Sequence, residues 1–168
     1  MLKLVGAVMI FGACALSGIR YGMRWRRRQE YYEQLEGWLT FLQLEISYSR
    51  SSMGELLMRG KKEYPELSFL SDCERRMAQG ASFSGALSAA VTAAAKEHPE
   101  YQRGLGIAGE LASTLGTTDM ADQQLVLQLA QHKLALLIDE AREDRKKYEK
   151  LYRSLGVLGG MMVVLVIL

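Results

Sequence analysis

The chain has 168 residues, a formal net charge of +2 and only two prolines. That length suits one domain, and a charge so close to zero gives no indication of a nucleic-acid partner. The composition is rich in good helix formers. The sequence has no low-complexity stretch, which argues against a disordered chain. The two cysteines, Cys14 and Cys73, show no pairing pattern, so we expect no disulfide framework and a reducing compartment.

The first expected element is a membrane helix within residues 1–25. Residues 4–19 carry no charge and approach the ~20 apolar residues that cross a bilayer. Basic and aromatic residues follow at once, as a membrane–water boundary favours, and the basic side is expected to face the cytoplasm. The predicted interface residues at this end are Arg20, Arg24, Trp25, Arg26, Arg27 and Arg28.

A cleaved signal peptide is the alternative for this segment. Residues 11–14 faintly resemble a lipoprotein cleavage box, although Phe11 is a poor residue there. Signal peptides carry their positive charge before the apolar run. Here only Lys3 precedes the run and five arginines follow it, so the asymmetry favours a retained anchor.

The middle of the chain, residues 26–153, predicts an all-α body, because no stretch alternates apolar and polar residues with period two. Ser52, followed three positions later by Glu55, fits a capping box at a helix start. Pro65 and Gly80 are expected to end the two helices that come next. The helices expected before the last one span residues 28–49, 53–63, 66–79, 82–98 and 102–115.

A long final helix is expected over residues 119–155, which contain neither Gly nor Pro. Its first half carries an apolar stripe, and Leu125, Leu129 and Leu136 add a second apolar face. A helix that is apolar on several sides is normally surrounded by others. We therefore expect this half to lie inside the bundle.

The same helix changes character at Asp139. Beyond that residue the sequence is highly charged, and only Ala141 and Tyr148 continue the apolar stripe. We expect this segment to contact a single neighbour, the start of the first helix. Its charges suit either a solvated helix face or a docking surface for a partner.

An apolar tail, residues 154–168, is expected to enter the membrane, with Lys150 and Arg153 as interface residues. Its last 14 residues span about 21 Å as a helix, which is less than the ~30 Å hydrocarbon core. A shallow tail that does not cross is therefore the alternative. The predicted fold is an antiparallel bundle of about six helices with N-terminal and C-terminal membrane helices, divided as 1–25, 26–153 and 154–168.

Signals for chemistry are weak. Residues 104–109 spell GxGxxG, but a dinucleotide site needs a strand before this motif, and an Ala-rich helix precedes it here. Close helix packing is the better interpretation. His98 and His132 lack ligand-spaced companions, and no serine has a His–Asp context. We predict no catalytic residue, no cofactor and no metal.

Several stretches in a fixed order resemble one known family, the stage III sporulation protein AB family. The resemblance covers essentially the full length, although Ser51-Ser52-Met53 and Ala112-Ser113 depart from the family pattern. The matching stretches are MLKLVGAVMIFGACALSG at the start, Leu44-Glu45-Ile46 with Tyr48, residues 51–56, Leu115-Gly116 with Asp119, Gln123-Gln124, and the ending YEKLYRSLGVLGG.

This family is in turn similar to the cytoplasmic domain of type II secretion F proteins, a six-helix bundle. The resemblance implies a platform in the cell membrane, the mother-cell membrane that faces the forespore during engulfment. It implies that this platform links a cytoplasmic ATPase to other components of a secretion-like sporulation channel. It leaves homo-oligomer formation open.

Two hypotheses follow for function. The first is a membrane-anchored scaffold without enzymatic activity that docks the channel ATPase. Its candidate contact residues lie at the turn into the last helix, where a tight turn with a helix cap is the structural alternative. The second is a membrane-tethered sensor or enzyme with an unrecognised site. The candidate contact residues are Leu115, Gly116, Asp119 and Gln123.

Overall fold

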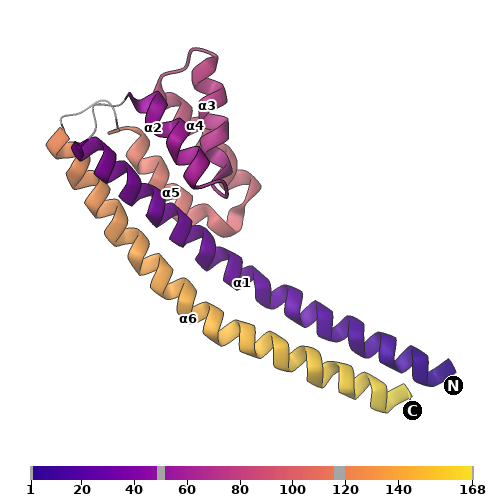
Figure 1. Cartoon of the computed structure of the whole chain (residues 1–168). Coiled ribbons are helices and arrows are strands. Elements are labelled where there is room, and N and C mark those ends of the chain that lie inside the picture. The colour runs from indigo at the N-terminus through magenta and orange to yellow at the C-terminus, as the bar shows by residue number, and fades with distance from the viewer. Residues whose placement is uncertain (1, 49–51, 116–119, 168) are drawn as a thin grey trace. The chain divides into compact units, whose positions relative to one another are not determined.

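The computed structural model describes residues 2–48, 52–115 and 120–167, and every regular element in them is helical (Figure 1). The all-α prediction is confirmed for these residues. The segment expected at 4–19 and the described part of the segment expected at 28–49 lie on one continuous helix, which ends at Tyr48. The elements are α1 (Leu2–Tyr48), α2 (Met53–Glu63), α3 (Ser68–Ala78), α4 (Phe83–Glu97), the 3₁₀ helix η1 (Pro99–Tyr101), α5 (Gln102–Ala112) and α6 (Met120–Ile167).

The chain divides into two compact units, and the second boundary falls at Asp139, where the charge pattern changes. One unit, which we call the bundle, is Glu30–Ile138. The other, which we call the helix pair, combines Met1–Gln29 with Asp139–Leu168. The long helices α1 and α6 each contribute one part to each unit.

Local sequence signals set the short helices of the bundle. The Ser52 side chain accepts a hydrogen bond from the Glu55 N–H, and the Glu55 carboxylate accepts one from the Ser52 N–H, as the capping-box pattern predicted. Helix α3 ends just before Gly80, whose φ is +95°. The Ser82 hydroxyl caps α4 by accepting from the Gly85 N–H.

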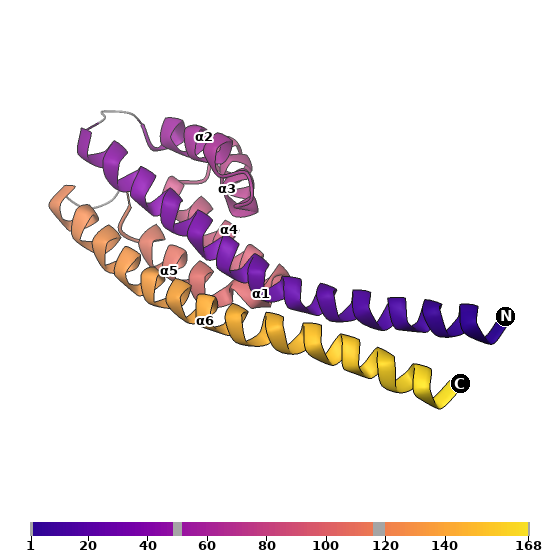
Figure 2. The same cartoon turned by 60° about the horizontal axis from the view of Figure 1, so that its bottom comes forward.

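The bundle encloses an apolar core. Helix α4 packs against α3 and α5 (Figure 2). Its buried face contains small alanines that let helices approach closely. Trp38 of α1 is 1% exposed, and its ring meets Phe69 of α3 edge-on, with centroids 5.4 Å apart. Cys73, also on α3, is fully buried, and burial raises the pKa of its thiol to about 11. The thiol is therefore protonated and unreactive near neutral pH.

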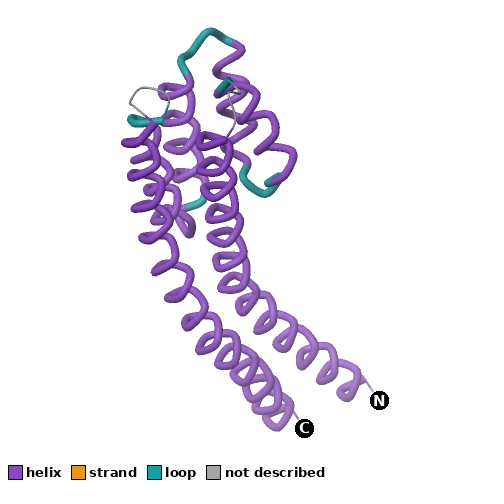
Figure 3. The backbone as a smooth tube through the Cα atoms, turned by 60° about the vertical axis from the view of Figure 1, so that its left-hand side comes forward, coloured by secondary structure: helices purple, strands orange, loops and turns teal. Residues whose placement is uncertain are grey.

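The helix pair is held by contacts between its two helices. The rings of Trp25 and Tyr148 stack with their centroids 4.4 Å apart. Arg28 forms an ion pair with Asp144, with 3.4 Å between Nη1 and Oδ2. These contacts show that the two helices run antiparallel. Figure 3 shows the backbones of the two helices side by side. The charged segment of α6 was expected to contact the start of the helix predicted at 28–49, and its contacts with Arg28 and Gln29 confirm this.

The structure describes only some of the side chains in the two segments that were expected to be membrane helices. Within the part of the chain that the structure describes, no helix has the length and apolar character needed to span a membrane. The side chains of residues 1–8 and 163–168, which belong to the two predicted anchors, are not among those described.

Candidate functional site

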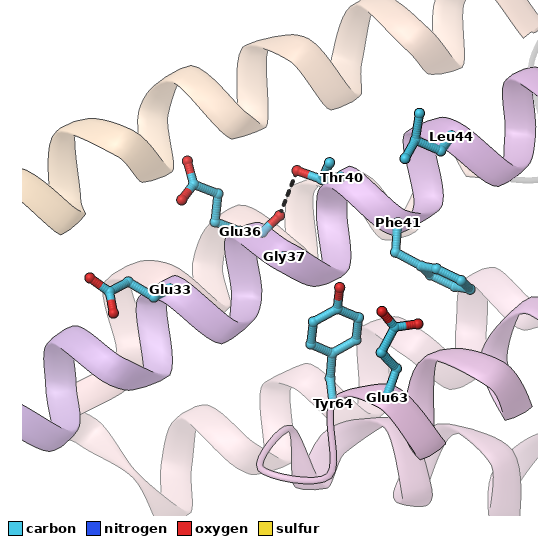
Figure 4. A pocket seen from close by; sticks show the side chains of 8 residues that line it. All are labelled: Glu33, Glu36, Gly37, Thr40, Phe41, Leu44, Glu63 and Tyr64. Atoms are coloured by element: carbon cyan, nitrogen blue, oxygen red, sulfur yellow. Dashed lines mark hydrogen bonds between the residues drawn. The ribbon is translucent and has the colours of Figure 1, made fainter.

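A groove of about 350 Å³ opens on the surface of the bundle between α1 and the end of α2 (Figure 4). It combines carboxylates, a phenol and apolar side chains. In Figure 4, Glu63 and Tyr64 rise from the end of α2 toward α1, which supplies the other lining residues. The groove is lined by Glu33, Glu36, Gly37, Thr40, Phe41, Leu44, Glu63 and Tyr64.

The absence of a side chain at Gly37 shapes this groove. A Cβ atom there would lie 2.8 Å from Cε1 of Tyr64, closer than real contacts allow. The Tyr64 ring can therefore lie directly on the backbone of α1. Its position is fixed from the other side as well, because the Tyr64 N–H donates a hydrogen bond to the Gly60 carbonyl at the end of α2.

The electrostatics of the groove are acidic. Glu33, Glu36 and Glu63 contribute three carboxylates, while Phe41 and the exposed Leu44 contribute apolar surface. Burial, followed by the charge of Glu63 and its hydrogen bond, raises the pKa of Tyr64, so this hydroxyl remains a donor at neutral pH. Such a lining suits a cationic segment with an apolar anchor. The described lining residues include no histidine, cysteine or lysine.

This groove was not predicted from the sequence, although the sequence contains a signal for it. Glu33, Gly37, Thr40 and Leu44 recur at helical spacing and share one face of α1. That face is only partly apolar, so the pattern resembles an ordinary solvated side. The decisive partner, Tyr64, is distant in sequence, and only the folded chain brings it to Gly37.

A second surface feature is an exposed apolar face on α6, which we call the leucine face. Leu125, Leu129 and Leu136 are 57%, 54% and 60% exposed, so the prediction that other helices surround this side is wrong. The opposite side of α6 explains the difference. Leu127 and Leu134 there are fully buried, so Leu125, Leu129 and Leu136 face away from the described helices of the bundle.

The predicted contact residues at the turn into α6 divide into two groups. Gly116 and Asp119 lie outside the described residues. Leu115 is 1% exposed and Gln123 is 8% exposed, so both belong to the interior of the bundle. Their burial favours a packing role for these two side chains, and the partner contact of the segment stays a prediction.

The predicted interface residues all belong to the helix pair. Trp25 and Arg28 are half-buried because they contact α6. The Arg153 side chain is outside the described ones. The exposed members are Arg20, Arg24, Arg26, Arg27 and Lys150.

The GxGxxG sequence lies inside α5, so it has no strand–turn–helix context. A Cβ atom on Gly104 would lie 2.6 Å from Cε1 of Tyr32, which confirms the close-packing interpretation at that position. Gly106 faces open space. Among the residues that the structure describes, no three metal-ligating side chains gather into a cluster.

Fold and surface together define an all-helical bundle protein whose two longest helices continue into an antiparallel pair. The family model of stage III sporulation protein AB matches residues 3–168, and the chain belongs to this family. Stage III sporulation protein AB of Bacillus subtilis (strain 168) is 25% identical to it over 175 aligned positions, which cover all of both chains. No solved structure gives a significant match. Family membership supports a role in sporulation.

Proposed function

We propose that this protein is a membrane-anchored structural component of a secretion-like channel between mother cell and forespore. In this role it docks the cytoplasmic ATPase of the channel and holds it near the membrane. The full-length family match supports the sporulation context. The platform and the docking extend beyond that match and rest on the surface of the bundle.

The observation that carries the docking proposal is the leucine face of α6. Three leucines, each more than half exposed, share one side of one helix, since 125, 129 and 136 differ by four and seven positions. Exposed apolar patches of this kind mark protein interaction sites. We place the ATPase contact on this face together with the segment that precedes α6 in the sequence, which contains Gly116 and Asp119.

Membrane anchoring is supported by composition. Residues 4–19 are uncharged and residues 154–168 are apolar. Basic residues follow the first segment and precede the second in the sequence. This arrangement supports a bundle on the cytoplasmic side of the mother-cell membrane. A reporter fused after Ser154 tests the orientation, because an externally accessible reporter contradicts it.

Capture of the channel ATPase by the full chain, solubilised in mild detergent, tests the docking. We expect Leu125→Gln combined with Leu129→Gln to reduce capture strongly, since polar groups on the face remove its apolar contact area. The matched control is Met58→Gln, because Met58 is equally exposed, at 60%, but belongs to a different helix, α2.

Three outcomes are informative. Loss of capture by the leucine variant alone supports the proposed surface. Equal capture by both variants contradicts that surface, and the Asp119→Ala variant then tests the turn by itself. If the wild-type chain does not capture the ATPase, the docking proposal is wrong.

A further inference from the structure

The helix pair carries positive charge in a narrow zone along its two helices. Gly22 lies against Glu149, Trp25 stacks on Tyr148, and Arg28 pairs with Asp144. In this antiparallel register, residues 20–27 of α1 are level with about residues 145–152 of α6. Two clusters that are distant in sequence therefore lie at the same height along the helix pair.

We call the exposed cations at this height the basic belt. Its members extend over about 10 Å of helix length, which is close to one Debye length at physiological ionic strength. Glu149 is the one acidic residue among positions 20–27 and 146–152, and it is paired with Arg145 at 3.0 Å. The members are Arg20, Arg24, Arg26, Arg27, Lys146, Lys147 and Lys150, all exposed.

The adjacent turns toward the bundle show the opposite pattern. There Arg28 contacts Asp144 and Glu140, and Arg142 pairs with Asp139 at 3.2 Å. Acidic and basic groups thus alternate below the belt and nearly cancel. The excess of one sign begins only at the belt, so it is a local feature and does not reflect the charge of the whole chain, which is +2.

On the other side of the belt, both helices expose large apolar side chains. Met9 and Leu16 of α1 are 71% and 65% exposed, and Leu158 and Met162 of α6 are 62% and 71% exposed. A cationic zone that borders exposed apolar surface on one side and balanced charge on the other matches the layered chemistry of a bilayer face.

We propose that the basic belt binds the headgroups of anionic phospholipids in a bilayer. Residues of both helices form the belt, and together they make one site. This site contacts the membrane surface rather than a protein partner. Each Lys or Arg near an anionic surface contributes attraction that decays within a Debye length. The inference rests on the proposed membrane anchoring and adds a lipid class to it.

Flotation of the full chain with vesicles tests this inference. One set of vesicles contains phosphatidylcholine alone, and the other contains phosphatidylglycerol as well. We expect stronger association with the second set and a loss of that preference as salt is raised. The belt variant is Lys146→Gln with Lys150→Gln, which we expect to lower association with anionic vesicles roughly thirtyfold at low salt, from about fivefold per charge.

The matched control is Lys62→Gln with Lys96→Gln, two exposed lysines of the bundle whose removal changes net charge equally. Unchanged association of this control, beside a weakened belt variant, supports the inference. Equal association of the wild type with both vesicle sets, or equal losses in the two variants, overturns lipid selection and leaves anchoring intact. Absence of association with either vesicle set overturns the anchoring itself.

Discussion

The bundle and the helix pair share the helices α1 and α6, yet different forces hold them. The bundle buries a continuous apolar core that includes Trp38, Leu70 and Leu87. In the helix pair, the buried residues among those described are Gly22, Gln29 and Ala141, none of which is a large apolar side chain. Among the described contacts, ring stacking and ion pairs link its two helices.

This difference indicates which of the two units contributes more to the folding free energy. Burial of large apolar side chains supplies most folding free energy, so the bundle is the unit that can fold by its own contacts. Among its described side chains, the helix pair exposes large apolar ones, and its described contacts contribute about 1 kcal/mol each. We therefore expect the described part of the helix pair to open more easily than the bundle.

The largest expected effect comes from breaking the bundle core with Trp38→Ala. The Trp38 ring is almost fully buried against Phe69, and its removal leaves a cavity. We expect the full chain to lose about 3–5 kcal/mol in free energy of unfolding. A urea titration followed by circular dichroism measures this loss. Leu129→Ala, at an exposed position, is the control and is expected to change stability by less than about 0.5 kcal/mol.

A smaller effect separates two glycines of α5. Gly104→Ala forces a Cβ atom into the Tyr32 ring, so we expect a loss of about 1–3 kcal/mol. Gly106→Ala enters open space and removes backbone entropy from the unfolded chain, so we expect a gain of about 0.5–1 kcal/mol. The same titration compares the two. Equal signs for both substitutions contradict the close packing at Gly104.

In the helix pair, a double-mutant cycle with Trp25→Leu and Tyr148→Leu measures the stacked rings. We expect a coupling of about 1 kcal/mol, within the range for aromatic pairs. Hydrogen exchange of the amides around positions 25 and 148 is the measurement, because it reports local opening. Protection of the α4 amides is expected to stay unchanged. A parallel loss there would show that the two units open together.

The smallest effect is expected for Arg28→Met, which removes the ion pairs with Asp144 and Glu140. Partly exposed pairs contribute about 0.2–1 kcal/mol and are screened by salt. We therefore expect local opening of the helix pair to increase slightly at low salt, and the difference from wild type to vanish at high salt. The effect of Trp38→Ala is expected to persist at both ionic strengths.

Much of the fold follows from the sequence because its signals are local. The capping box at Ser52 and the end of α3 before Gly80 each depend on a few neighbouring residues. The change at Asp139 is equally local, since it is a switch from apolar to charged composition, and the two units divide there. The basic clusters at both ends are also visible in the sequence alone.

The tertiary structure decided which faces find a neighbour. Helical spacing shows that Leu125 and Leu129 share a side, but it does not show whether another helix covers that side, and none does among the described residues. The groove likewise depends on Tyr64 meeting Gly37, a contact between segments far apart in sequence. Periodicity identifies a face, whereas packing between distant segments determines what that face contacts. For the same reason, only the register of α1 against α6 joins the two basic clusters into one belt.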